Sequence, residues 1–263
     1  MVRVSIDDPT HQIDGVTLHQ RLAHISAHLE RLAAGEEKFT EPAWLRRTTE
    51  EPRLLVGLAV LVAIWLQFMV PGSLAFQPHW LLPGIELLLL FVIILFRQTS
   101  VVDRQSRYLR ALGLTLVIAA SIATAWSAGR LVIELIHNHH AGNDLGSAGL
   151  LLRNGGAIWA TNVIVFALWY WEMDRGGPVA RACGTHTHTD FLFSQMTAPE
   201  LVPKDWEPTF IDYLYLSFTN ATAFSPTDTL PLSRWAKMVM MFQSAVSLVT
   251  VALVVSRAVN VLV

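Results

Sequence analysis

Charge and cysteine are both scarce in this chain. Only 15% of its 263 residues are Asp, Glu, Lys or Arg, against about 25% in an average soluble domain. Cys183 is the one cysteine, which excludes an internal disulfide framework and any metal site built from several cysteines. The net charge of −2 gives the whole chain no basic footprint for nucleic acid. This balance argues against a disordered chain, a fibrous chain and an ordinary cytosolic enzyme.

Familiar catalytic motifs are missing as well. The chain contains no Walker loop, no His-Glu-x-x-His, no Gly-x-Ser-x-Gly and no dinucleotide fingerprint. We therefore expect neither enzymatic activity nor a bound cofactor.

Long apolar runs, in contrast, are abundant. Hydrophobic residues make up 52% of the sequence, and its mean hydropathy is +0.42. A helix that crosses the hydrocarbon core of a bilayer needs about 20 mostly apolar residues. Five stretches predict such helices: 54–70, 80–96, 108–136, 155–171 and 235–263. The sequence therefore predicts an all-α, multi-pass membrane protein with the lipid bilayer as its first partner.

Arginine and lysine are unevenly distributed among the loops that join these runs. They occur before the first run, after the second and after the fourth, whereas the loops 71–79 and 137–152 contain neither. Basic loops favour the cytoplasmic side of a membrane. The first apolar run begins after residue 50, which is too far along for a signal peptide. We therefore expect residues 1–50 to remain on one side, with the N-terminus cytoplasmic.

Four regions follow from these patterns. Residues 1–50 are a cytoplasmic amphipathic segment, 51–173 a four-helix transmembrane region, 174–207 a polar loop and 208–263 a C-terminal unit. The first segment has apolar residues on heptad spacing at Leu18, Leu22, Ile25, Leu29 and Leu32. Its helix is expected either to mediate oligomerisation or lie on the membrane surface, or to pack on the protein's own cytoplasmic face.

Histidines gather in three places that bear on metal binding, one of which is the loop with His137, His139 and His140. His24 and His28 lie one helical turn apart, and His186 and His188 lie close together in the polar loop. Such tracts can bind zinc or respond to pH. No second set of ligands accompanies either pair at a telling distance. We therefore predict no metal site, with solvated histidines as the favoured interpretation and these four residues as the candidates to test.

The C-terminal unit carries the most informative pattern. A short semi-polar stretch, 210–223, is followed by a polar turn and then by a strongly apolar helix. So short a stretch is typical of a re-entrant helix. Non-helical backbone at membrane depth is tolerated only where protein buries it or where it lines water. These features predict a pore loop followed by an inner helix.

Part of this unit resembles, without a gap, the pore region of bacterial potassium-channel-type proteins. It reads SFTNATAFSPTDTLPLSRWAK, where that family has SFTTLTTVGYGD followed by a proline and a small-residue-plus-base step. The matching positions are Ser217, Phe218, Thr219, Thr222, Asp228, Pro231, Ala236 and Lys237. The same region resembles a group of uncharacterised bacterial membrane proteins. The resemblance covers roughly a fifth of the chain and implies an oligomeric, channel-like protein in a bacterial plasma (inner) membrane.

Both glycines of the family's filter are absent here. A potassium filter needs its carbonyls to point into the pore, and glycine permits the backbone angles involved. The aligned residues are Ala223, Phe224, Ser225, Pro226 and Thr227. Pro226 fixes its own φ and restricts Ser225. We therefore expect no potassium-selective carbonyl filter.

Side chains would then line any constriction at this position. The polar candidates are Thr222, Ser225, Thr227 and Asp228, and a ring of Asp228 in a homo-oligomer would favour cations. The resemblance thus implies a channel that passes a small inorganic cation without potassium selectivity. In the alternative, Asp228 and Thr229 merely cap the next helix, and the protein is a non-conducting scaffold or partner-binding protein that retains the fold.

The loop charges leave the course of residues 208–224 open. In the channel family the pore loop enters from outside, but five spans with a cytoplasmic N-terminus place this stretch inside. The stretch either spans fully, or forms an inverted loop, or the charge rule does not hold here. We favour the full span, which requires partners for Asp212 and Asn220 within the bundle.

One pair of charges lies inside a predicted span. Arg130 and Glu134 are four residues apart and hence on one face of the third apolar helix. Charged groups in spans are functional candidates, but those near a helix end often extend to the interface. We favour a structural ion pair.

Overall fold

The computed structural model describes residues 26, 42–46, 54–97, 105–137, 148–184, 188–222 and 228–262. The chain divides into two units, Met1–Glu41 and Pro42–Val263. In the first unit Ser26 is the one residue described, and it is helical. The predicted heptad pattern, His24 and His28 therefore lie outside the described residues.

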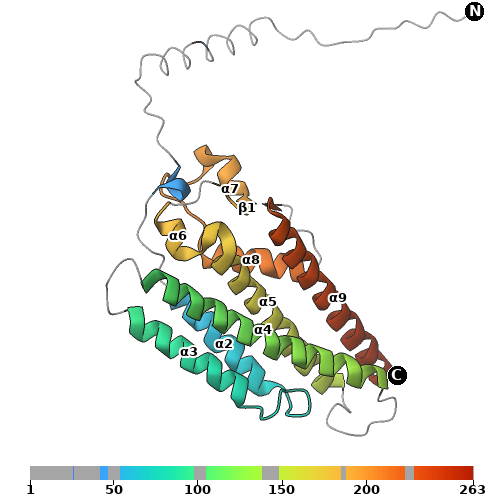
Figure 1. Ribbon diagram of the computed structural model, residues 1–263. Helices are drawn as coiled ribbons and strands as arrows, with labels where there is room; N and C mark the ends of the chain where they lie inside the picture. The colour runs from blue at the N-terminus through green and yellow to red at the C-terminus, as the bar shows by residue number, and fades with distance from the viewer. Residues whose placement is uncertain are drawn as a thin grey trace, which may run out of the picture. The chain divides into compact units, whose positions relative to one another are not determined.

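Helices make up most of the second unit (Figure 1). The long ones are α2 (Leu54–Met69), α3 (Leu81–Arg97), α4 (Gln105–His137), α5 (Ala148–Met173) and α9 (Arg234–Leu262). The short ones are η1 (Ala43–Leu45), η2 (Asp174–Gly176), α6 (Pro178–Ala182), α7 (Ser194–Thr197), η3 (Pro199–Leu201) and α8 (Phe210–Ala221). Two strands, β1 (Phe191–Phe193) and β2 (Thr229–Pro231), pair antiparallel with Leu192 opposite Leu230.

Within the part of the chain that the structure describes, three helical segments are long and apolar enough to cross a membrane: Arg110–Ile136, Ala148–Gly176 and Arg234–Asn260. Helices α2 and α3 are also apolar but have 16 and 17 residues. At about 1.5 Å per residue they reach about 24–26 Å, slightly less than a hydrocarbon core of about 30 Å. The predicted all-α membrane protein is confirmed at this level, whereas the number of spans remains a prediction.

The outer faces of the long helices are apolar. Exposed side chains on them include Leu58, Trp65, Leu88, Phe91, Ile122, Met241 and Leu248. A soluble monomer rarely exposes contiguous apolar surface on this scale. Hydrocarbon contact accounts for such a surface because lipid tails, unlike water, impose no penalty on it.

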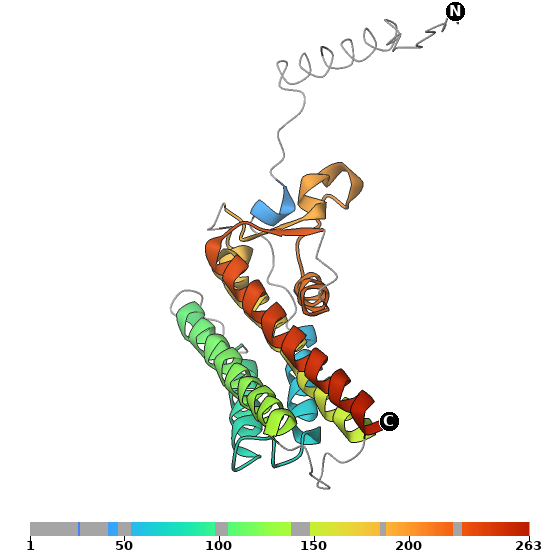
Figure 2. The same cartoon turned by 90° about the vertical axis from the view of Figure 1, so that its right-hand side faces the viewer.

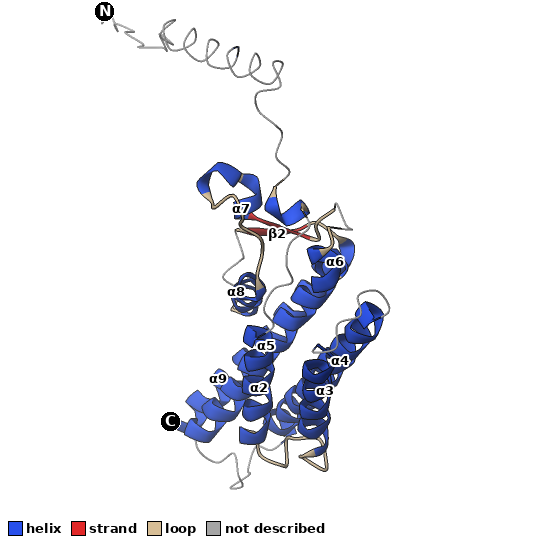
Figure 3. Ribbon diagram, turned by 90° about the vertical axis from the view of Figure 1, so that its left-hand side faces the viewer, coloured by secondary structure: helices blue, strands red, loops and turns tan. Residues whose placement is uncertain are grey.

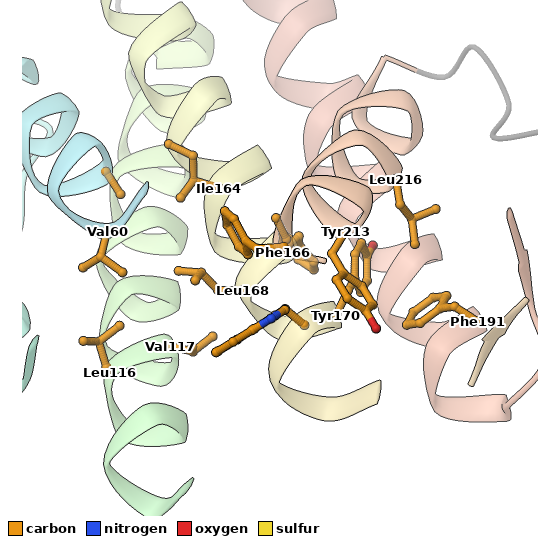
Figure 4. Close-up of a cluster of buried hydrophobic side chains, with 14 of the residues drawn as sticks. Val60, Leu116, Val117, Ile164, Phe166, Leu168, Tyr170, Phe191, Tyr213 and Leu216 are labelled. Carbon is orange, nitrogen blue, oxygen red and sulfur yellow. The ribbon is translucent and has the colours of Figure 1, made fainter. Parts of the chain in front are cut away.

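Helix α5 lies at the centre of the bundle, in contact with α2, α4, α8 and α9. Figure 4 shows Val60 of α2 and Leu116 of α4 on one side of α5, and Tyr213 and Leu216 of α8 on the other. Gly155 lets α9 approach closely, because a Cβ there would lie 2.6 Å from a methyl of Val254. From Ala157 to Glu172 the helix is buried on nearly every face, which explains why α5 shows little amphipathic pattern.

Helix α8 crosses this bundle instead of running along it. Figures 2 and 3 look nearly along its axis, while α5 and α9 appear lengthways. Its first residue, Phe210, packs on Trp171 near the end of α5. Farther along, Ser217 Oγ donates to the carbonyl of Val163 at 2.6 Å, and the Phe218 ring packs on Trp159. α8 therefore descends from one end of α5 to its middle.

The chain then returns to the end at which α8 began. Thr229 of β2 lies opposite Phe193, whose ring is 5.4 Å from that of Tyr213. Helix α9 also begins there, where Trp235 Nε1 donates to Asp190 at 2.8 Å. The twelve residues of α8 rise only about 18 Å, and Phe210 at its start lies at the same end of α5 as Thr229 of β2. Whether residues 208–224 span the membrane fully stays a prediction.

The region predicted as a polar loop, 174–207, is folded. Its described residues include α6, α7 and β1, and Phe191 and Phe193 are buried. Phe191 packs against the rings of Tyr170, Tyr213 and Trp235. The apolar residues within the polar stretch therefore close one end of the core, where sequence composition alone indicated a linker.

Candidate functional site around helix α8

Two of the seven predicted filter-like residues are described, Thr222 at the start of this stretch and Asp228 at its end. Thr222 ends α8, and its Oγ1 donates to the carbonyls of Phe218 and Thr219 at 3.1 and 3.0 Å. Asp228 directly precedes β2 and accepts a hydrogen bond from Tyr215 of α8. The other five, Ala223 to Thr227, lie outside the described residues. Asp228 is therefore tied back to the helix that leads into the turn.

Tyr215 belongs to an exposed stripe on α8. Tyr215 donates its hydrogen bond to the Asp228 carboxylate. Ile211, Tyr215 and Phe218 are 57%, 52% and 47% exposed, and their spacing places them on one face of the helix. The face of α8 that carries Tyr215 is thus available to lipid or to another chain.

Asp228 and Thr229 do not cap α9. Thr229 begins β2, and α9 starts only at Arg234. The capping contact comes instead from Ser233, whose Oγ accepts a hydrogen bond from the backbone of Ala236 at 3.4 Å. The interpretation of Asp228 as a helix cap is therefore wrong, because a strand separates it from the helix.

The α8 network is a set of buried polar side chains that join α5, α8 and α9: Tyr170, Ser217, Asn220, Gln243, Ser244 and Ser247. Gln243 is at its centre and is fully buried. Its Oε1 accepts from Tyr170 at 2.6 Å and from Asn220 at 2.8 Å. Its Nε2 donates to the hydroxyl and carbonyl of Ser217 at 2.7 and 3.0 Å. Both ends of this amide are satisfied by α5 and α8.

Helix α9 also satisfies the end of α8. The last carbonyls of a helix have no partner within it. Ser244 Oγ donates to the carbonyl of Asn220 at 3.2 Å, and Ser247 Oγ donates to that of Ala221 at 2.6 Å. Trp159 Nε1 in turn donates to Ser247 at 2.7 Å. The end of α8 is therefore fixed in the middle of the bundle without bulk water.

The two polar residues that needed partners in this stretch have them. Asn220 Nδ2 donates to Gln243 and to the carbonyl of Met240 at 2.9 Å. Asp212 forms a capping box with Thr209, whose backbone nitrogen donates to Asp212 Oδ2 at 2.7 Å. This box defines where α8 begins.

A second buried cluster fixes the start of α8 to the end of α5. Asp174, which is fully buried, accepts from Tyr213 Oη at 2.6 Å and from the backbone of Asp190 at 3.1 Å. Arg181 donates to the carbonyl of Asp174 at 3.0 Å and lies over the Tyr213 ring. The Tyr213 hydroxyl therefore acts as a buried hydrogen-bond donor to Asp174.

Sequence patterns had not singled out Tyr170, Asp174 or Gln243. A signal for Gln243 is present, since Gln243, Ser247 and Thr250 recur at helical spacing within an apolar run and are all buried. Polar residues at such positions in a membrane helix indicate a partner within the bundle. Asp174 follows the apolar run directly and gives no comparable signal.

The remaining sequence predictions concern the ion pair of Arg130 with Glu134 and the histidines. Arg130 and Glu134 form the favoured ion pair at 3.6 Å, and Arg130 also donates to the carbonyl of Ser73. Among the described residues no three His, Cys, Asp or Glu side chains gather as a metal site would require. His188 is described, whereas His186 lies outside the described residues.

Comparison with known proteins provides no relative from which the role of the α8 network could be inferred. No family model, curated protein or solved structure matches the chain.

Proposed function

We propose that this protein is an oligomeric, channel-like membrane protein that passes small inorganic cations through the turn between Thr222 and Asp228. The observation that carries the proposal is the course of residues 210–231. A short helix descends to the middle of α5, and the chain then returns to its starting end beside a long apolar helix. The resemblance to potassium channels implies an outer helix, a short helix, a returning segment and an inner helix. In this chain α5, α8, the return to β2 and α9 follow in that order.

The rigid mounting of α8 supports this proposal. Irregular backbone at membrane depth persists only where protein or a water-filled cavity surrounds it. The α8 network holds the helix from both α5 and α9. Side chains that bind a passing ion must be held in fixed positions, because small displacements change their distances to the ion. The hydrogen bonds of the α8 network would hold the adjoining turn in place.

Asp228 gives the proposed pore its preference for cations. It adjoins the turn, and its hydrogen bond to Tyr215 fixes it relative to α8. A ring of carboxylates from several copies would attract cations and repel anions. Without the glycine-containing carbonyl filter, no potassium selectivity is expected.

A second copy of the chain is the proposed partner of the exposed stripe on α8. Ile211, Tyr215 and Phe218 lie next to the turn in the sequence and are exposed. A pore bounded by one turn from each copy would bring these stripes against neighbouring copies. The protein is therefore proposed to be a homo-oligomer in a bacterial plasma membrane.

The proposed pore loop enters from the basic end of the bundle. Arg175 and Arg181 lie there with the start of α8, and Arg234 and Lys237 begin α9. By the loop-charge rule this end is cytoplasmic. The loop would then be inverted relative to that of potassium channels, with the N-terminus inside.

Ion flux through liposomes that contain the purified protein tests the proposal. Potassium and sodium flux should rise with the amount of protein, and chloride flux should stay low. Asp228→Asn should reduce the cation-to-anion permeability ratio several-fold, because it removes the charge and keeps the shape. Asp205→Asn, which changes an exposed carboxylate outside α8, is the matched control. Equal ratios in the two variants would contradict the role of Asp228.

One observation favours a non-conducting scaffold as the second candidate. The last carbonyls of α8, which could face an ion, are satisfied by hydroxyls of α9. A folded, oligomeric protein that passes no ion at any pH or voltage would support this alternative.

A further inference from the structure

The α2–α5 pocket, a cavity of about 500 Å³, lies at the opposite end of α5 from the start of α8. In Figure 1 this is the lower end of the bundle, where the loop after α2 turns back into α3. The end of α2, that loop and the first turns of α5 line the pocket through Phe68, Met69, Gly72, His79, Leu150 and Arg153. Its volume falls within the range of about 300–1,000 Å³ that is usual for small-molecule sites.

Hydrogen bonds and burial fix the loop that lines this pocket. The amide of Leu74 donates to the carbonyl of Pro71 at 2.9 Å. The Gln77 side chain donates to the carbonyl of Gly72. Leu74 is fully buried, in a cluster that includes Ile158 of α5. The loop is therefore attached to α5, so the pocket has its shape before any ligand binds.

One cation borders the pocket without a counter-charge. Arg153 Nε donates to Oδ1 of the fully buried Asn154 at 3.4 Å. Among the described residues no carboxylate pairs with this guanidinium, whereas Arg130 at the same end pairs with Glu134. None of the described lining residues is acidic. The pocket therefore carries a positive charge that an anion would neutralise.

The surroundings of the pocket are those of a membrane surface. Trp80, which directly follows His79, is 60% exposed, and tryptophan is enriched where hydrocarbon meets the headgroups. Phe68 and Met69 are also exposed, at the end of an apolar helix. The pocket thus joins an apolar rim, made by Phe68 and Met69, to a charged group at the depth of the lipid headgroups.

We propose that the α2–α5 pocket binds the phosphate of an anionic phospholipid, with the acyl chains against the apolar rim. A guanidinium binds phosphate oxygens through two hydrogen bonds at once, and basic pockets between membrane helices bind lipid headgroups in this way. His79 supplies a further donor, since an imidazole donates at least one hydrogen bond in either protonation state. Free phosphate has the same headgroup chemistry but makes no use of the apolar rim.

The charge of the headgroup follows from the lining. A zwitterionic headgroup brings an ammonium group, and no described acidic residue of the pocket is there to pair with it. An anionic headgroup brings only the charge that Arg153 attracts. Preference for the anionic lipid is therefore the distinguishing property of this site.

This site does not depend on the proposed pore. None of the described residues that line the pocket belongs to α8, to the turn or to α9. The pocket is therefore expected to bind its lipid whether or not Asp228 takes part in ion passage.

Two lipids with the same acyl chains and different headgroups test the proposal. Native mass spectrometry of the purified full chain in a neutral detergent measures the binding of phosphatidylglycerol and of phosphatidylcholine. We expect phosphatidylglycerol to bind about tenfold tighter, the effect of roughly one hydrogen bond between charged groups. Arg153→Gln should remove this preference. Arg130→Gln, which removes a cation that is already paired and lies outside the lining, should keep it.

A second pair of variants tests the location without altering a charge. Leu150 lines the pocket, so Leu150→Trp should fill part of it and weaken phosphatidylglycerol binding several-fold. Leu152→Trp is the control, because Leu152 is exposed and does not line the pocket. This comparison remains informative if Arg153→Gln fails to fold.

Three outcomes would overturn the proposal. Equal binding of the two lipids would mean a lipid layer without a specific site. A preference that persists in Arg153→Gln, or binding that is unchanged in Leu150→Trp, would place any site elsewhere. Displacement of phosphatidylglycerol by inorganic phosphate would identify the free anion as the ligand and would contradict a lipid site.

Discussion

At the scale of single residues, Gln243 has the largest structural role in the candidate site. Its side chain is fully buried and joins Tyr170, Ser217 and Asn220 by hydrogen bonds. A buried amide with all its partners satisfied stabilises a unique packing, whereas its loss leaves several groups unpaired. The position of α8 therefore depends on one side chain of α9.

Replacing Gln243 should destabilise the bundle. In Gln243→Leu, Ser217 loses its donor and Asn220 loses an acceptor, and each buried unsatisfied group costs about 1–3 kcal/mol. A lower midpoint of thermal unfolding in detergent is expected. Ser256→Ala, which changes an exposed polar residue of the same helix, should unfold like the original protein. A Gln243→Leu variant of unchanged stability would show that the network contributes little.

Glu86 is a second residue whose burial sets a prediction. It is fully buried in α3, and Gln67 Nε2 of α2 donates to both of its carboxyl oxygens at 3.0 Å. Gln67→Leu removes that donor and should cost about 1–3 kcal/mol. The double variant Gln67→Leu, Glu86→Leu should regain part of this loss, because no polar group is then left unpaired. Thermal unfolding of the original protein, Gln67→Leu, Glu86→Leu and the double variant tests the coupling, and additive losses would argue against it.

At the scale of elements, the close approach of α5 to α9 at Val254 requires a glycine at position 155. A methyl at Gly155 would lie 2.6 Å from Val254, whereas one at Gly156 would meet nothing within 4 Å. Gly155→Ala should therefore destabilise the protein by about 1–3 kcal/mol through overpacking. Gly156→Ala should be neutral or stabilising by up to about 1 kcal/mol, because alanine favours the helix.

Unfolding midpoints of the two alanine variants check this contrast. The double variant Gly155→Ala, Val254→Ala should regain part of the lost stability, because it lacks the Val254 methyl groups that the new Cβ would contact. Equal midpoints for the two single variants would show that α9 can move aside at no cost.

Sequence patterns predict the long helices well and the short elements poorly. Apolar runs place α2, α3, α4, α5 and α9 within a few residues, except that α5 begins at Ala148, seven residues before the predicted start. Arg153 and Asn154 interrupt hydropathy there without interrupting the helix. The pairing of β1 with β2 could not be predicted, because strands of three residues carry no periodicity.

For the candidate site, the sequence predicts the position of α8 but not what holds it. The short semi-polar run and its resemblance placed a helix at 210–223, and the structure has it at Phe210–Ala221. The partners Tyr170 and Gln243 lie 50 and 23 residues from Asn220. No local pattern links such distant positions, since only the packed bundle brings them together.

At the scale of the whole molecule, the proposed oligomer predicts contacts between copies at α8. In a Cys183→Ser background, Phe218→Cys should form cross-links with a short bismaleimide, because the exposed stripe would face a neighbouring copy. Leu88→Cys is the control, since Leu88 is exposed on α3. Denaturing gel electrophoresis of treated membranes reads out the products. Cross-links at Leu88 alone, or at neither position in a protein shown to be monomeric, would contradict the proposed assembly.

The course of the chain through the membrane can be tested directly by sidedness. In sealed, uniformly oriented vesicles, Leu201→Cys and Leu230→Cys in a Cys183→Ser background report the two ends of the α8 segment, since both side chains are exposed. The structure predicts that a membrane-impermeant maleimide labels both from the same side, the side that also labels native Cys183. Labelling of Leu201→Cys and Leu230→Cys from opposite sides would mean that residues 208–224 span the membrane, and would contradict the proposed pore loop.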